Sequence, residues 1–344
     1  MGVNTAQTSS VLILGGSGQA GSDTAALLRR WYPDLPLTIA GRTPERLRKV
    51  AGELGTATTA TIDLSRPDLG LPAGGAYSAV IATLWDNQLN GLRFAQDRGV
   101  PYLSISSGLA DIGPEVIAAA QRPTTSPIAI GSHWCAGTAT IATLLAARDF
   151  TRAGGGRVDA VHVGAILDAN DVGGPAGVAD LERFATATTA GLVRRGGVFT
   201  WVNGADAEVA VERADGTTVT GQAIAIPDVP SVALATGAKD VTFAFAVHED
   251  SIPPVEVRIE LEGTDSSGAP LRQSYLLTHP SGQRPLTALG LALTAERLIG
   301  RQGPPVAPGV HTPESLIDLT HAATHLTATG ATFTRLTSTA AVGR

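Results

Sequence analysis

A glycine-rich turn between two apolar segments constrains this chain most. The run Val11 to Leu14 leads into Gly16-Ser17-Gly18-Gln19-Ala20-Gly21, which fits the pattern G-x-G-x-x-G, and apolar residues recur in the segment that follows. A strand, a tight turn and a helix are the natural structure of this order. The first glycine permits the turn, the second lets a pyrophosphate approach the backbone, and the third lets the helix pack closely on the strand. We therefore predict the dinucleotide-binding loop of a Rossmann domain; the alternative is an ordinary glycine turn.

The end of the second expected strand indicates which dinucleotide is preferred. We expect Leu37 to Ala40 to form this strand, and Gly41, Arg42 and Thr43 follow it. An NAD-selective site usually places a carboxylate there for the adenosine ribose, whereas an arginine suits the 2′-phosphate of NADP. Arg42 and Thr43 therefore predict a preference for NADP(H). The alternative is that Arg42 is an ordinary solvated surface residue.

Later strand ends supply the remaining predicted contacts of the cofactor. Asp63 and Leu64 follow the third expected strand and are predicted to lie near the adenine, although Asp63 could equally cap a helix. Thr83 and Trp85, after the fourth strand, are expected to line the path to the nicotinamide. Ser106, after the fifth strand, is either a hydrogen-bond partner of nicotinamide or substrate, or a turn residue.

The order of the expected elements predicts the fold class. Expected strands at residues 58–64, 79–84, 101–106 and 127–130 alternate with helical segments, which implies a doubly wound parallel sheet. From about Arg157 the sequence becomes rich in short strands joined by turns. We predict an α/β chain made of an N-terminal Rossmann domain (1–132), an α+β domain for substrate and dimerisation (133–307), and a C-terminal segment (308–344) that returns to the Rossmann domain.

Composition and charge narrow the partners. The 344 residues, 43% of them hydrophobic, are enough for two domains, and a net charge of -6 offers no basic face for nucleic acid. We find no signal-peptide pattern and no apolar run near the roughly 20 residues that span a bilayer, so we expect no membrane partner. The single cysteine is compatible with a reducing cytoplasm. We expect a cytoplasmic homodimer, formed through the β-rich domain, that acts on a small molecule.

Three residues are predicted to take part in chemistry. His133, just past the sixth strand, is the first candidate for a proton donor, because imidazole delivers protons near neutral pH. The alternative is a structural histidine in a packed joint between domains. Cys135 could touch substrate, or it could be a small buried apolar residue. Asp86 could orient substrate or an iminium, or it could be a loop residue before the next helix.

Other polar groups have mainly structural alternatives. Residues 168–177 are polar and glycine-rich, which is typical of a substrate loop or lid, or of a surface turn. Arg194 and Arg195 could bind a substrate carboxylate, or they could be solvated charges. His321 and His325 have the spacing of metal ligands on one helix face, but Ala322 stands where a zinc protease has its glutamate. We predict a surface pair and no metal.

Three stretches of the chain resemble the saccharopine dehydrogenase (saccharopine reductase) family. They are VLILGGSGQAGSDTAALL, TIAGRTPERLRKV and, near the end, GPPVAPGVHTPESLID. The resemblance covers roughly the first 130 residues and this C-terminal stretch. It implies a Rossmann domain, a substrate domain inserted before a returning C-terminal segment, and NAD(P)-dependent oxidoreduction at a carbon–nitrogen bond.

The resulting hypothesis is an NADPH-dependent oxidoreductase that reduces an imine or related C=N bond of a small amino-acid-derived or secondary-metabolite substrate. Reduction of a carbonyl or an activated C=C bond on the same scaffold is one alternative. A non-catalytic NADPH-binding regulator is another. It is motivated by Tyr102-Leu103-Ser104 and Cys135-Ala136-Gly137, which stand where the family often has Tyr-x-Asp and Pro-Gly.

Overall fold

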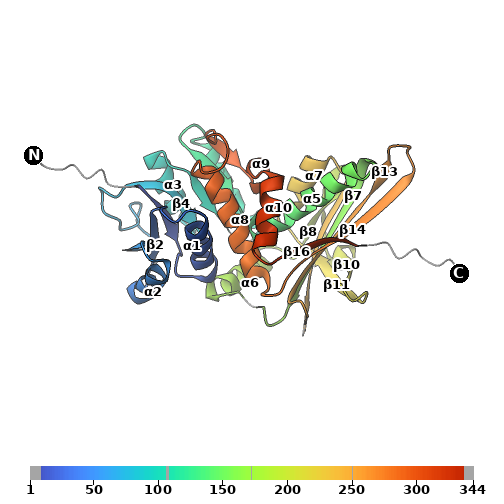
Figure 1. Ribbon diagram of the computed structural model, residues 1–344, viewed down its shortest axis with the longest axis horizontal. Helices are drawn as coiled ribbons and strands as arrows, with labels where there is room; N and C mark the ends of the chain where they lie inside the picture. Colours follow the sequence, from blue (N-terminus) through green and yellow to red (C-terminus); the bar gives the residue numbers. More distant parts are fainter. Residues whose placement is uncertain (1–8, 106–107, 172, 250, 337–344) are drawn as a thin grey trace, which may run out of the picture.

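A parallel sheet forms the N-terminal part of the protein (Figure 1). The computed structural model describes residues 9–105, 108–171, 173–249 and 251–336. Within these residues the sheet has seven strands in the order β15-β6-β5-β4-β1-β2-β3, and all its pairings are parallel. The strands are β1 (Ser10–Leu14), β2 (Leu37–Gly41), β3 (Thr58–Thr61), β4 (Tyr77–Ala82), β5 (Tyr102–Ser104), β6 (Pro127–Ile130) and β15 (Gly309–His311).

Helices cover both faces of this sheet because its central strands are apolar on both sides. In β1, Val11 and Ile13 belong to one apolar core, whereas Leu12 and Leu14 belong to a second core on the opposite face. This arrangement confirms the predicted doubly wound sheet. The helices of this part are α1 (Gln19–Trp31), α2 (Pro44–Leu54), α3 (Asn90–Arg98) and α4 (Leu109–Ala120).

The second sheet is mostly antiparallel, as the turn-rich sequence predicted. Its path runs β10-β11-β12-β7-β13-β14-β16, with β8 joined to β12 and β9, and the neighbours β12 and β7 are parallel. Within the described residues its nine strands are β7 (Gly155–Asp168), β8 (Gly191–Arg195), β9 (Val198–Val202), β10 (Glu208–Glu212), β11 (Thr218–Ala223), β12 (Asp240–His248), β13 (Val255–Asp265), β14 (Pro270–His279) and β16 (Thr332–Leu336).

Several of the remaining helices lie between the two sheets. Figure 1 shows α8 and α10 standing between the sheets, with α6 at the edge of the same junction. The first core continues from β1 through α5 and α8 into β7, so both parts of the chain share it. No helix in the described part of the chain is both long and apolar enough to cross a membrane. The helices outside the N-terminal part are η1 (Trp134–Gly137), α5 (Thr138–Arg152), α6 (Pro175–Ala187), η2 (Gly204–Ala207), α7 (Asp228–Thr236), α8 (Gln283–Leu298), α9 (Pro313–Leu316) and α10 (Leu319–Ala328).

The C-terminal segment is divided between the two sheets. β15 pairs with β6 in the first sheet, and α10 packs against α5 and α8. β16 instead pairs with β14 at the edge of the second sheet. The expectation that residues 308–344 pack on the Rossmann domain therefore does not describe β16. Its position has a physical reason, because it satisfies backbone groups that the outer edge of β14 would otherwise leave unpaired.

Candidate functional site

The loop between β1 and α1 has the close packing that a dinucleotide loop needs. A Cβ on Gly21 would lie 2.5 Å from the carbonyl oxygen of Gly15 and 2.8 Å from the Thr83 hydroxyl. That hydroxyl donates a hydrogen bond to the Leu14 carbonyl at 3.0 Å. Gly18 is the N-cap of α1, where no side chain caps the helix and the first turn has no acidic residue. The helix-terminal N–H groups are therefore available to an anion.

The end of β2 places a free positive charge beside this loop. Gly41 is buried, and a Cβ there would lie 3.5 Å from the Ser17 hydroxyl, so the loop and the strand end meet. Arg42 and Thr43 follow and are exposed. Within the described residues Arg42 has no ion pair or hydrogen bond. Its guanidinium can therefore pair with an anion that binds beside the loop.

The loop after β3 is held by its own hydrogen bonds. The Asp63 carboxylate accepts from the Ser65 backbone N–H at 2.9 Å and from the Ser65 hydroxyl at 2.7 Å, and these bonds lower the pKa of Asp63. The residue closes a turn and caps no helix, unlike the alternative considered from the sequence. The Leu64 carbonyl accepts from the Asn90 amide at 2.7 Å, which ties this loop to the start of α3.

Two side chains that follow β4, Trp85 and Asp86, are engaged in different ways. Trp85 is half-buried, and the Arg183 guanidinium lies 4.2 Å from the centre of its ring. Asp86 is buried and accepts from the backbone N–H groups of Gly91 at 2.6 Å and Gln88 at 3.2 Å. Burial raises the pKa of Asp86, and these hydrogen bonds partly oppose that shift. The geometry favours the structural alternative, in which Asp86 organises the turn into α3.

A second buried carboxyl group lies beside Asp86 and was not expected. Glu115 of α4 is buried next to the Tyr102 hydroxyl, and burial raises its pKa. Together with Asp86, Ser104 and Trp85 these residues line a cavity of about 10 Å³. Its volume suits about one water molecule and no substrate. Sequence signals for Glu115 were weak, since it is a lone acid in an apolar helix. Ser106, the predicted contact beyond β5, lies outside the described residues.

His133 lies buried where three distant segments of the chain meet. Its Nε2 is 2.8 Å from the Ser231 hydroxyl of α7 and 3.6 Å from a Glu314 carboxylate oxygen of α9. Its Nδ1 is buried without a hydrogen-bond partner among the described residues. The ring is thus held in place through one nitrogen, and the other is a buried group whose hydrogen-bonding capacity is unused.

Asp228 fixes the backbone that follows His133. Its carboxylate accepts from the Trp134 N–H at 2.8 Å and the Thr140 hydroxyl at 2.6 Å. Burial raises the pKa of Asp228, while the neighbouring His133 acts in the opposite direction. Because Asp228, Ser231 and Glu314 come from segments far from residue 133, no spacing in the sequence pointed to them.

Cys135 occupies a tightly packed turn. Cys135 and Ala136 have φ of 49° and 52°, a left-handed conformation that non-glycine residues rarely adopt, and Gly137 follows with φ of 93°. Gly290 of α8 lies so close to the Cys135 and Ala136 carbonyls that a side chain could not fit there. Burial raises the pKa of the Cys135 thiol well above its usual range. This is the buried structural alternative, since a reactive cysteine needs a low pKa and access.

Residues 168–171 and 173–177 belong to the segment predicted as a lid or a surface turn, and the last of them form the start of helix α6 beside the Rossmann loop. Asp171 accepts from the Gln283 N–H at 2.7 Å at the start of α8. A Cβ on Gly174, the N-cap of α6, would lie 3.4 Å from the Gln19 side chain. Farther along α6, Arg183 pairs with Asp111 of α4 at 3.1 Å and covers Trp85. The helix therefore lies across the junction, beside both the glycine loop and the end of β4.

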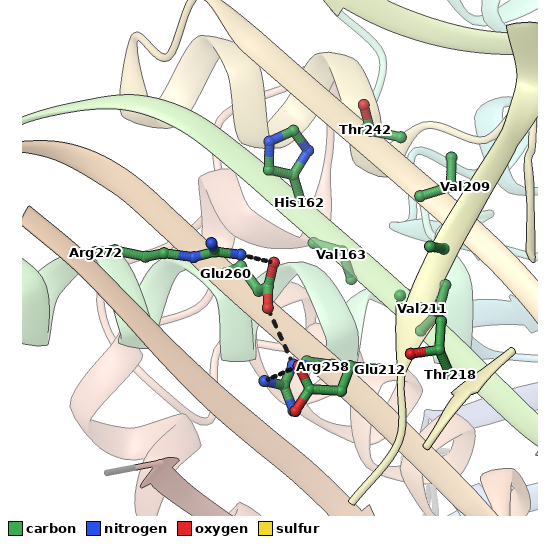
Figure 2. Close-up of a pocket in the computed structure, with 12 residues that line it drawn as sticks. His162, Val163, Val209, Val211, Glu212, Thr218, Thr242, Arg258, Glu260 and Arg272 are labelled. Carbon is green, nitrogen blue, oxygen red and sulfur yellow. Dashed lines mark hydrogen bonds and ion pairs between the residues drawn. The ribbon is translucent and has the colours of Figure 1, made fainter. Parts of the chain in front are cut away.

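A larger cavity lies on the outer face of the second sheet (Figure 2). It measures about 220 Å³ and is open to solvent. Its charged side chains pair with one another: Arg258 lies 3.0 Å from Glu212, and Glu260 bridges Arg258 and Arg272. None of the residues predicted for cofactor or chemistry lines it. The cavity is thus separate from the residues around the glycine loop.

The two arginines proposed for a substrate carboxylate are engaged in the fold. Arg194 donates to the carbonyls of Ala233 and Ala238 at 3.2 and 3.0 Å, and Arg195 donates to the Asp206 carbonyl at 3.1 Å. Both arginines therefore tie β8 to neighbouring backbone, Arg194 to the end of α7 and the segment after it and Arg195 to η2, and their binding of a substrate carboxylate stays a prediction.

The two-domain fold is that of saccharopine dehydrogenase-like proteins. The apo form of saccharopine dehydrogenase (L-Glu forming) from Saccharomyces cerevisiae is similar with a TM-score of 0.67 and 11% identity, covering 96% of this chain and 100% of that chain. Homospermidine synthase from Legionella pneumophila, solved in complex with NAD, gives 0.59 at 12% identity, with 98% and 94% covered.

A myo-inositol dehydrogenase from Corynebacterium glutamicum is similar with a TM-score of 0.50 and 15% identity, covering 96% of this chain and 99% of that chain. No protein-family model matches the chain. No curated protein matches it by sequence. The similarity to solved structures confirms the fold that the sequence resemblance implied.

Proposed function

We propose that this protein is an NADPH-dependent oxidoreductase that reduces an imine or related C=N bond of a small amino-acid-derived or secondary-metabolite substrate. One observation carries the proposal: the uncapped N-terminus of α1 and the unpaired Arg42 lie at neighbouring strand ends. Both are sites where phosphate groups bind. The fold shared with a saccharopine dehydrogenase and a homospermidine synthase supports the choice of reaction.

The residues beside the glycine loop fit a dinucleotide. Gly18 is exposed, so a pyrophosphate can approach the backbone and the first N–H groups of α1. Arg42 and Thr43 would hold the 2′-phosphate, because no carboxylate follows β2 to repel it. Leu64 would lie near the adenine, and Trp85 would line the path toward His133. Helix α6, which touches Gln19 and Trp85, would cover the bound cofactor and exclude water.

His133 is the best-placed proton donor. When bound, NADPH supplies a hydride to the unsaturated carbon of the substrate. With both ring nitrogens protonated, Nε2 would donate to the Ser231 hydroxyl and face the Glu314 carboxylate, and Nδ1 would deliver its proton to the substrate nitrogen. Asp86 and Cys135 keep the surrounding backbone in place, and we assign them no proton transfer.

The cofactor assignment is tested by titrating the protein with NADPH and NADH and following tryptophan fluorescence. Charge-assisted hydrogen bonds to a phosphate contribute about 1.5–3 kcal/mol, so Arg42→Ala should weaken NADPH binding about ten- to hundredfold and leave NADH binding nearly unchanged. Arg122→Ala is the matched control, because Arg122 is an exposed arginine after α4 that pairs with Asp97. Equal affinity of wild type and Arg42→Ala for NADPH would remove the basis of the proposal.

The role of His133 is tested with a panel of imines, ketones and enoyl compounds. His133→Gln can keep a hydrogen bond to Ser231 but cannot deliver a proton. We expect kcat for the imine to fall about 10²- to 10⁴-fold while NADPH binding is retained. His162→Gln, on the outer face of the second sheet, is the control. Full activity of His133→Gln would assign the proton to another group, and turnover of ketones alone would exclude imine reduction.

A further inference from the structure

Two histidines and a buried glutamate meet where α8 and α10 pack together. His321 and His325 are four residues apart on α10, so they share one face of the helix. The structure brings Glu296 of α8 against this face. One ligand atom from each of the three residues lies within 4.8 Å of the other two. The proposed reductase mechanism uses none of these three residues.

The position of Glu296 is unusual for an acidic residue. Its side chain is 1% exposed, on a helix whose other faces are packed with leucine and alanine. A buried carboxylate is costly unless it is paired or bound to a metal ion. One of its oxygens accepts from the Tyr32 hydroxyl at 2.7 Å, and the other lies 2.5 Å from His321 Nε2. The carboxylate is therefore oriented with one oxygen toward the histidine pair.

Contacts between aromatic rings hold the two histidine side chains in place. The His325 ring lies 4.1 Å from the Trp31 ring and 4.4 Å from the His321 ring, measured between ring centres. Both histidines are partly exposed, which leaves a path from solvent to the cluster. The Tyr32 hydroxyl orients the carboxylate in the way that outer hydrogen-bond partners commonly orient metal ligands.

We propose that Glu296, His321 and His325 form a binding site for a divalent transition-metal ion, with Zn²⁺ as the best match. Two imidazoles and one carboxylate are a ligand set that Zn²⁺ accepts, with water in the fourth position. Bonds of about 2.1 Å place tetrahedral ligand atoms about 3.4 Å apart. Ligand atoms that lie as far as 4.8 Å apart must therefore approach by up to about 1.4 Å, whereas His321 Nε2 and the Glu296 oxygen, now 2.5 Å apart, must separate by about 0.9 Å. The ion takes the place of the hydrogen between His321 Nε2 and Glu296, and His321 binds it as a neutral imidazole. The Nε2 proton moves to Nδ1, or leaves to solvent if Nδ1 already carries one.

From the sequence we predicted no metal site, because Ala322 stands where a zinc protease has a glutamate next to the first of the two histidines, His321 and His325. In the fold the carboxylate comes from α8 instead. A bound ion would join α10 to α8 and, through Tyr32, to the end of α1. The site would thus stabilise the packing of the C-terminal helix, away from the glycine loop.

The test is a titration of the untagged full chain with ZnCl₂ by calorimetry, and with CoCl₂ followed by absorption and tryptophan fluorescence. We expect one ion per chain, visible Co²⁺ bands of a tetrahedral site, and quenching that is largely lost in Trp31→Phe. His321→Gln and His325→Gln should each weaken Zn²⁺ binding at least about tenfold. His162→Gln should bind like the wild type, because His162 lies on the outer face of the second sheet.

The result that overturns the proposal is wild-type binding indistinguishable from that of the His321→Gln/His325→Gln double variant. Both histidines are partly exposed, so these variants should fold, and circular dichroism checks this. Should a variant unfold, the wild type alone still decides, since absence of both the Co²⁺ bands and the quenching refutes the site. Neither readout involves NADPH or a substrate, so the test stands apart from the proposed reductase activity.

Discussion

Replacing Gly18 with alanine would separate the binding of a dinucleotide from the folding of its loop. Gly18 has φ of -80° and ψ of 168°, a conformation that alanine adopts without strain. Among the described residues its Cβ would meet only the Gly15 carbonyl oxygen, at 3.2 Å. Loss of glycine at the N-cap costs about 0.5–1 kcal/mol, and the reduced entropy of the unfolded chain offsets about as much. The free energy of unfolding should therefore stay within about 0.5 kcal/mol of wild type.

The same substitution should clearly weaken NADPH binding. If the pyrophosphate approaches the backbone at Gly18, the added methyl group crowds it as an extra methyl crowds a packed core. Such crowding costs about 1–3 kcal/mol, which corresponds to an affinity loss of about five- to 150-fold. The substituted protein would then be folded but deficient in cofactor binding.

Gly21→Ala provides the opposite case. Gly21 is buried, and its Cβ would lie 2.5 Å from the Gly15 oxygen, so the helix start would have to shift. We expect a loss of about 1–3 kcal/mol in the free energy of unfolding. Urea unfolding followed by circular dichroism and NADPH titration would be measured for both variants. Wild-type affinity in Gly18→Ala would refute the reasoning, because the cofactor would then not contact this loop as proposed.

Two further predictions concern the position of α6 at the edge of the junction between the two sheets and the buried carboxyl group of Glu115. Arg183→Ala removes the stack on Trp85 and the ion pair with Asp111, which together contribute about 1 kcal/mol. Hydrogen exchange of the backbone amides of α6 should therefore accelerate. The control is Arg48→Ala, which breaks an exposed ion pair on α2 and should leave the exchange of α6 unchanged. Exchange unaltered in Arg183→Ala would mean that other contacts hold the helix. Burial raises the pKa of Glu115 above its usual 4.5. Between pH 4.5 and the native pKa, the native state therefore binds this proton more tightly than the unfolded chain does. The free energy of unfolding of the wild type should consequently fall as the pH rises through this range. Position 115 in Glu115→Gln does not titrate, so the urea midpoint of this variant minus that of the wild type should increase over the same pH range. A difference that does not change with pH would contradict the raised pKa of Glu115.

The parallel sheet was predictable because its sequence signals are local. Short apolar runs end in glycine or polar turns, and Thr43-Pro44 starts α2 as expected for a cap followed by proline. Helix α6 was missed because it follows Gly173 and Gly174, which favour a turn. Its apolar Val178 and Leu181 are 41% and 61% exposed, so no apolar stripe marks the helix. Its packing on the Rossmann loop is a tertiary effect.

The residues around the glycine loop were easier to place from the sequence than those around His133, for a physical reason. A glycine loop and the following strand end belong to one βαβ unit, so their spacing in the sequence fixes their proximity in space. The surroundings of His133 are assembled from α7 and α9, more than ninety residues away along the chain. Likewise, Glu296 meets His321 only because α8 packs against α10. No local pattern encodes such meetings.

What distinguishes the functional candidates is whether their hydrogen-bonding capacity is already used. Asp63 and Asp86 both lie at strand ends where chemistry is expected, yet each carboxylate accepts from nearby backbone N–H groups. Arg42 and the Nδ1 atom of His133 also lie beyond strand ends, and neither has a partner among the described residues. A buried nitrogen without a partner costs free energy in the isolated protein, which a bound substrate or water would recover. The proposed function therefore rests on Arg42 and His133, because a ligand can still satisfy them, whereas the fold has already satisfied the two aspartates.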